Sequence, residues 1–73
     1  MIIKGLYTIK KITDYGIYDM PPTTKEKAIN DYNALIRYMT AMKDEDAIIV
    51  ILTMDDKGNE ITVARTVVSK ERK

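Results

Sequence analysis

Carboxylates are the only side chains of this sequence whose grouping could support catalysis. Asp44, Glu45 and Asp46 form one acidic run, and Asp55 and Asp56 form a second. Paired carboxylates hydrolyse glycosides, but that reaction also needs a shaped cleft for the sugar. A chain of 73 residues without Trp or Phe has little material for such a cleft. We therefore do not expect carboxylate catalysis.

Other reactive or metal-binding side chains are scarce. The chain has no His and no Cys, which removes the commonest general base and the commonest low-pKa nucleophile. Its one serine, Ser69, falls in a C-terminal stretch, 69–73, that we expect to fray. The polar segment 55–60 lacks the ligand spacing of a calcium loop. We predict that the protein is not an enzyme and holds no metal or cofactor.

Nucleic-acid binding, or modulation of transcription, is the alternative function. Lys4, Lys10, Lys11 and Arg65 are the possible contacts if they converge on one face, and tyrosines could stack on bases. The 12 basic and 11 acidic residues nearly cancel, so net charge adds little attraction to phosphate. We therefore favour protein binding over nucleic-acid binding.

Nothing in the sequence indicates secretion or a membrane span. The first 12 residues contain three lysines and no apolar core of a signal peptide. The longest apolar run, 47–52, is far shorter than the roughly 20 residues that cross a bilayer. We expect a cytoplasmic protein.

Residues 47–68 predict a β-hairpin, around which the rest of the chain must be arranged. Two runs rich in β-branched residues, 47–54 and 60–68, flank a short polar segment. Gly58 is placed to take the positive φ of a type I turn with a bulge.

The N-terminal third predicts one secure strand and one short strand. Residues 2–12 alternate in the manner of a strand, and residues 13–16 read as a turn. Residues 17–20 would return as a second strand, which Pro21 and Pro22 end because proline cannot donate to a central ladder.

An amphipathic helix follows. Thr23 and Glu26 match a capping box, with Thr23 as the N-cap. Apolar residues then recur at helical spacing, and the acidic run at 44–46 opposes continuation because acidic residues are unfavourable at a helix C-terminus. The apolar stripe consists of Ala28, Ile29, Tyr32, Leu35, Ile36, Met39 and Met42.

These elements predict a single α+β domain over residues 1–73. The helix would pack on an antiparallel sheet of three to four strands, in the order β-(β)-α-β-β, as a two-layer sandwich. One helix covers one face, yet residues 47–54 are apolar on both. We expect Ile48, Val50 and Leu52 on the uncovered face to mediate self-association, since a small core often needs it. Coverage by Tyr and Lys stems is the alternative.

Tyrosine is the one compositional feature that indicates binding. All five aromatic residues are tyrosines, and Tyr32 belongs to the core stripe. We predict Tyr15, Tyr18 and Tyr38 as contacts with a partner, because tyrosine gives large contact area at low entropic cost.

In size and composition, this short chain rich in Ile, Lys and Tyr resembles the accessory proteins that phages encode to inhibit host enzymes or defence systems. The resemblance implies an inhibitor or modulator of a host or partner protein, acting in the cytoplasm of the host cell if a phage encodes it. With the self-association expected from the small core, we predict a homo-oligomeric inhibitor or modulator. A purely structural, oligomer-building protein is a further alternative.

Overall fold

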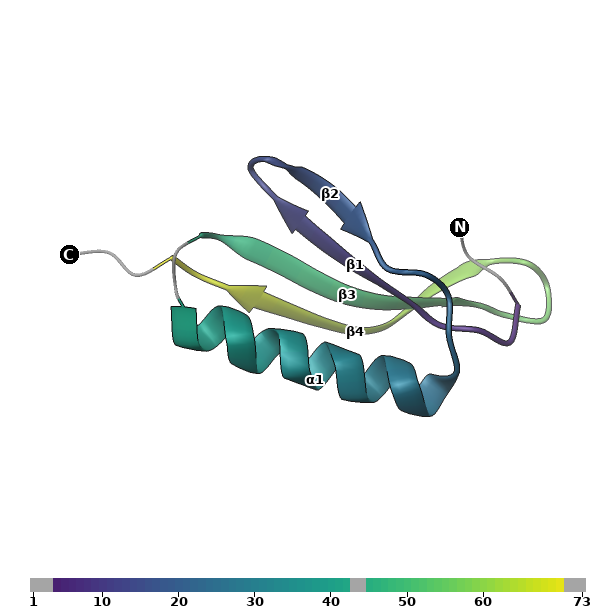
Figure 1. Ribbon diagram of the computed structural model, residues 1–73. Helices are drawn as coiled ribbons and strands as arrows, with labels where there is room; N and C mark the ends of the chain where they lie inside the picture. Colours follow the sequence, from purple (N-terminus) through teal and green to yellow (C-terminus); the bar gives the residue numbers. More distant parts are fainter. Residues whose placement is uncertain (1–3, 43–44, 71–73) are drawn as a thin grey trace.

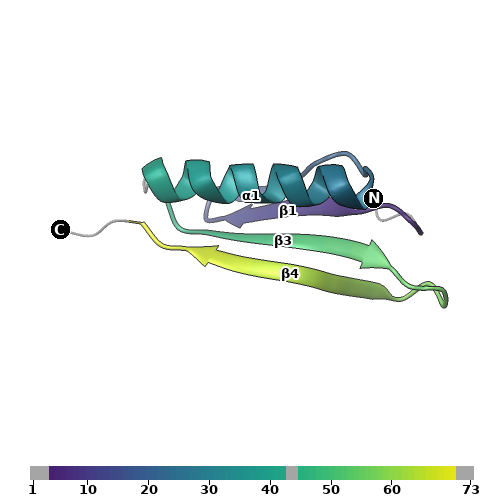
Figure 2. The ribbon, with the colours of Figure 1, turned by 90° about the horizontal axis from the view of Figure 1, so that it is seen from below.

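The computed structural model describes residues 4–42 and 45–70, which form one helix and four strands. Their order is β1 (Thr8–Thr13), β2 (Gly16–Asp19), α1 (Lys25–Met42), β3 (Ala47–Met54) and β4 (Glu60–Val68). The strands form one antiparallel sheet with the spatial order β2-β1-β3-β4. The helix runs along one face of this sheet (Figures 1 and 2). The predicted α+β fold, with the order β-β-α-β-β, is confirmed.

The β3–β4 hairpin forms as predicted, and hydrogen bonds among the residues of its turn close it. The N–H of Gly58 donates to the carbonyl of Asp55 (3.1 Å), and Gly58 has a φ of 84°. One carboxylate oxygen of Asp55 accepts from the N–H groups of Lys57 (2.9 Å) and Asn59 (2.8 Å). The register shifts between Ile51 and Leu52, which pair with Ala64 and Thr62, so Val63 is the extra residue of a β-bulge.

The first strand is shorter than the predicted span of residues 2–12. It begins at Thr8, because residues 4–5 form a turn in which Gly5 has a φ of 82°. Tyr7 pairs instead with Thr23 in an isolated bridge, with N–H to carbonyl distances of 2.8 and 2.9 Å. Residues 2 and 3 of the predicted strand lie outside the described residues.

The short second strand exists, one residue earlier than predicted, and ends at Asp19 before the two prolines. In the turn before it, the Thr13 hydroxyl accepts from the N–H of Tyr15 (3.1 Å) and donates to the carbonyl of Gly16 (3.3 Å). A threonine therefore closes this turn.

The predicted N-cap is wrong by one residue. The hydroxyl of Thr24 accepts from the N–H of Lys27 (3.3 Å), and the carbonyl of Thr24 accepts the first helical bond, from Ala28 (2.9 Å). Thr23 is occupied by its bridge to Tyr7. With Thr24 as N-cap, Glu26 falls at N2, so the reciprocal contact of a capping box is not made. The helix ends at Met42, close to the predicted position.

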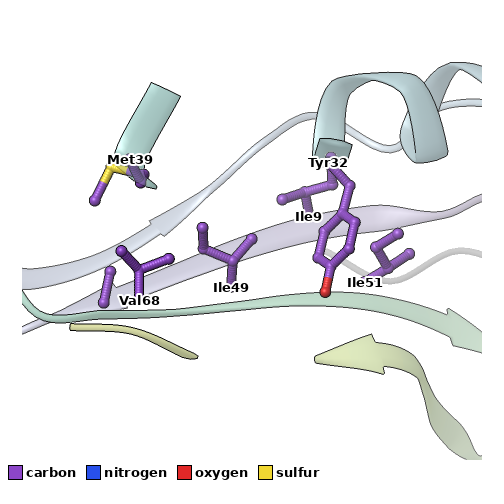
Figure 3. Close-up of a cluster of buried hydrophobic side chains, with 7 residues drawn as sticks. Ile9, Tyr32, Met39, Ile49, Ile51 and Val68 are labelled. Carbon is purple, nitrogen blue, oxygen red and sulfur yellow. The ribbon is translucent and has the colours of Figure 1, made fainter. Parts of the chain in front are cut away.

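The core lies between α1 and the sheet (Figure 3). Tyr32 points from the helix toward Ile9, Ile49 and Ile51, and Met39 lies on the Val68 side of the same cluster. Figure 3 shows the Tyr32 side chain reaching down to the sheet, where its hydroxyl makes a 2.5 Å hydrogen bond with the hydroxyl of Thr66. Bonding the buried phenol in this way avoids the cost of an unpaired polar group.

Candidate interaction surfaces

Acidic residues of the two runs at 44–46 and 55–56 have structural partners. Glu45 accepts from Lys11 at 3.2 Å, and Asp46 accepts from the backbone N–H of Lys70 at 2.6 Å. Asp55 closes the β3–β4 turn. Asp44 lies outside the described residues. Across residues 4–42 and 45–70, no three acidic side chains gather closely enough to hold a metal ion.

The face of the sheet opposite α1, here called the open face, is covered by no element of the described chain (Figure 2). Side chains alternate along each strand, so residues paired across strands share a face. The pairing therefore sets the rows of the open face. One row, here called the apolar row, crosses all four strands and consists of Ile17, Ile12, Ile48 and Val67.

The predicted interface residues of β3 all lie on the open face, but they differ in exposure. Ile48 is half-buried in the apolar row. Val50 and Leu52 are only 9% and 4% exposed. Val50 lies in register between Lys10 and Arg65, whose long stems can cover apolar neighbours while their charges stay in water. The apolar surface that remains accessible on the open face therefore lies at Ile48 and at the two ends of the apolar row.

The four predicted nucleic-acid contacts do not share one face. Lys10 and Arg65 lie on the open face, in a row that also contains Asp19. Lys11 lies on the helix side, where its ammonium pairs with Glu45 and stands 5.4 Å from the centre of the Tyr18 ring. Lys4 is 3.7 Å from Asp56 of the β3–β4 turn.

The β1–β2 hairpin carries the densest group of exposed apolar side chains. Within six residues, Tyr15, Ile17, Tyr18 and Met20 are 81%, 62%, 54% and 39% exposed. We call these four residues the hairpin cluster. Figure 1 shows β2 at the edge of the sheet, away from the helix, and the packing of α1 reaches only β1, β3 and β4.

A groove of about 280 Å³ separates β2 from α1. Tyr18 and Met20 line one side, Leu35 of the helix lines the other, and Ile9 and Lys11 contribute to the lining. The groove exists because the helix is too narrow to cover the fourth strand. It gives the hairpin cluster an apolar recess that is also lined by two charged residues, Lys11 and Asp19.

The three predicted contact tyrosines fall on two elements. Tyr15 and Tyr18 belong to the β1–β2 hairpin, whereas Tyr38 is on α1 and is 60% exposed. Tyr32 is 7% exposed in the core, as its place on the helical stripe predicted.

Sequence reasoning missed Ile17, Met20 and Val67 as exposed apolar residues, and Asp19 as their charged neighbour. Their alternation in residues 17–20 and 60–68 was visible, but which set faces outward depends on the pairing of strands. Only the register between β1 and its neighbours places Ile17 and Val67 in one row.

Comparison of the chain with protein-family models, with characterised proteins and with solved structures found no match. Helix α1, the one helix of the described residues, is not long and apolar enough to cross a bilayer.

Proposed function

We propose that this chain is a small, non-enzymatic protein-binding module that self-associates and inhibits or modulates a partner macromolecule through the β1–β2 hairpin. The observation that carries the proposal is the hairpin cluster, with Tyr15 81% and Tyr18 54% exposed beside a groove of about 280 Å³. Neighbouring exposed apolar side chains on a small protein are a feature of binding surfaces.

The chemistry of the cluster favours a protein partner. Tyrosine pairs a broad apolar ring with a hydroxyl that stays satisfied in water, so it suits a surface that is alternately exposed and covered. The groove could receive one apolar side chain of the partner between Met20 and Leu35. Lys11, already paired with Glu45, would add polar character at the groove. On the open face, Asp19 and Glu60 offset Lys10 and Arg65, which weighs against a nucleic-acid partner.

The double variant Tyr15→Ala/Tyr18→Ala tests the proposal. Proteins captured from a lysate of the cells in which the chain occurs would be compared with those captured by wild type. We expect the specifically bound protein to be lost, with affinity reduced at least about tenfold, because each buried tyrosine can contribute more than about 1 kcal/mol.

Lys57→Ala is the matched control, because Lys57 is exposed on the β3–β4 turn. A third variant, Tyr38→Ala, asks whether the helix contributes to the same contact. Unchanged capture by the double variant would contradict the assignment, and recovery of nucleic acid that nuclease removes would favour the alternative function.

A further inference from the structure

The apolar row contains the most exposed apolar side chains of the open face. It lies next to the β1–β2 turn, the beginning of β3 and the end of β4. Its two ends are its most accessible members, with Ile17 62% and Val67 55% exposed. A hollow of about 260 Å³ adjoins the row and is lined by Ile12, Ile48 and Val67 together with two acidic residues, Asp14 and Asp46. The exposed side chains at the two ends of the row favour an apolar occupant.

The neighbouring row carries charge in a pattern that is complementary to itself. Its order across the sheet is Asp19 on β2, Lys10 on β1, Val50 on β3 and Arg65 on β4. The acidic residue is therefore at one edge of the sheet and the exposed arginine at the other. A second copy that faces the first and is related to it by a two-fold rotation about an axis parallel to the strands would place its Asp19 opposite Arg65 of the first.

We infer that the occupant of the open face is a second copy of this chain, with the two sheets face to face about a two-fold axis parallel to the strands. The inference rests on the self-association in the proposed function and specifies its arrangement. Each apolar row would cover the other, Ile17 against Val67 of the second copy and Ile12 against its Ile48. The result is a four-layer α-β-β-α dimer, in which both helices lie outside.

The same rotation pairs the charges at the rim. Asp19 of each copy meets Arg65 of the other, twice in the dimer, where water still reaches both groups. Lys10 is in register with Asp19 of its own chain, so its ammonium can extend toward that carboxylate while its stem lies over Val50. Two sheets stacked in this way lie about 10 Å apart with strand directions within about 30°.

Other two-fold arrangements fit the surface less well. An axis perpendicular to the strands would place the apolar row over the row that contains Thr8, Leu52 and Thr62. It would also place each charged residue of the neighbouring row opposite the same residue of the second copy, so that like charges would face each other. Pairing of β4 edges would extend the sheet but leave Ile17 and Ile12 in water.

The size of the face sets the expected strength. Four strands about 4.8 Å apart, averaging about seven residues of about 3.3 Å, project to roughly 400 Å² per copy before side-chain relief is counted. Standard-size interfaces bury about 800 Å² per partner, so this projected area is about half of that and belongs to the class of weak interfaces. We expect a dissociation constant in the micromolar range.

A charge exchange between two chains tests the arrangement. Asp19→Arg alone places arginines opposite each other, and Arg65→Asp alone places aspartates opposite each other, so each variant should dimerise at least about tenfold more weakly than wild type. Mixed together, the two variants regain opposite charges at both contacts, and sedimentation velocity should show a restored dimer. Both positions are exposed, so circular dichroism and thermal unfolding should confirm that each variant folds.

Introduced cysteines give a second readout, because the chain has none of its own. Chains with Ile17→Cys and chains with Val67→Cys should be crosslinked to each other by a short bismaleimide, and neither should be crosslinked to itself. Crosslinking of Val67→Cys chains alone would indicate pairing of β4 edges and overturn the inference.

The outcomes separate the inference from the function on which it rests. A wild-type monomer at high concentration would overturn both the dimer and the self-association. A dimer that ignores the charge exchange would overturn only the face-to-face arrangement. Loss of partner capture by Tyr15→Ala/Tyr18→Ala concerns the hairpin and can occur with either result.

Discussion

At the scale of single residues, Asp55 shows how a carboxylate in a suggestive acidic pair can serve folding. Its oxygens accept from the backbone N–H groups of Asn59 and Lys57 and from the side-chain amide of Asn59. These bonds, that of the Asn59 backbone foremost, hold the pKa of the Asp55 carboxyl below its usual value of 3.8. The charged form is therefore the one that closes the hairpin turn.

This lowered pKa predicts how stability depends on pH. A carboxyl whose pKa is lower in the folded than in the unfolded state contributes stability that is present above the unfolded pKa and lost as pH falls through the folded pKa. Asp55→Ala should therefore be less stable than wild type at pH 7, and the gap should narrow as pH falls below 3.8. Urea unfolding across this range measures the gap, and Asp56→Ala is the neighbouring control. A gap independent of pH would contradict the assigned role.

At the scale of elements, the start of α1 is decided by competition between two adjacent threonines. Thr23 exchanges both backbone hydrogen bonds with Tyr7, which ties the chain to the segment before β1. Thr24 is left to cap the helix through its hydroxyl. Either threonine satisfies the local preference for an N-cap, so the long-range bridge makes the choice.

Single alanine substitutions should separate the two threonines. Thr24→Ala removes the capping hydroxyl and should lower the free energy of unfolding by about 1 kcal/mol. Thr23→Ala keeps the backbone bridge and should cost less than about 0.5 kcal/mol. Urea denaturation with circular dichroism detection measures both. A larger loss from Thr23→Ala would show that the cap lies where the sequence pattern first placed it.

At the scale of the whole molecule, one helix covers only one face of a sheet that is apolar on both faces. The helix side is sealed, with Ile49 and Ile51 at 0% and 1% exposure. On the open face, Val50 is 9% exposed between Lys10 and Arg65, whereas the ends of the apolar row are accessible. The burial of an apolar side chain on β3 therefore depends on what surrounds it on its own face, and residue type alone does not decide it.

Adjacent isoleucines on β3 report on this asymmetry. Ile49→Val removes a methyl group from the sealed core and should cost about 1 kcal/mol in the free energy of unfolding. Ile48→Val lies on the open face and should cost clearly less in dilute, monomeric protein. Chemical denaturation at low protein concentration makes the comparison. Equal losses would mean that the open face is as tightly packed as the core.

The sequence by itself determined the element types, their order along the chain and most of the helix residues that face the sheet. Ile29 and Met42 of the predicted stripe are exposed. Periodicity of 3.6 residues placed Tyr32 and Met39 in the core, and a polar segment with Gly58 placed the hairpin turn. These features depend on neighbours a few residues away, so local pattern is enough to predict them.

Only the tertiary structure decided which surfaces remain for function. Lys11 looked like a free basic contact, but it lies on the helix side and pairs with Glu45, 34 positions away. Val50 looked exposed, but Lys10 and Arg65 flank it from two other strands. Ile17 and Val67, 50 positions apart, meet in one row only because β2 and β4 are the opposite edges of one sheet. Register and face arise from pairing between distant segments, and periodicity within a segment does not encode them.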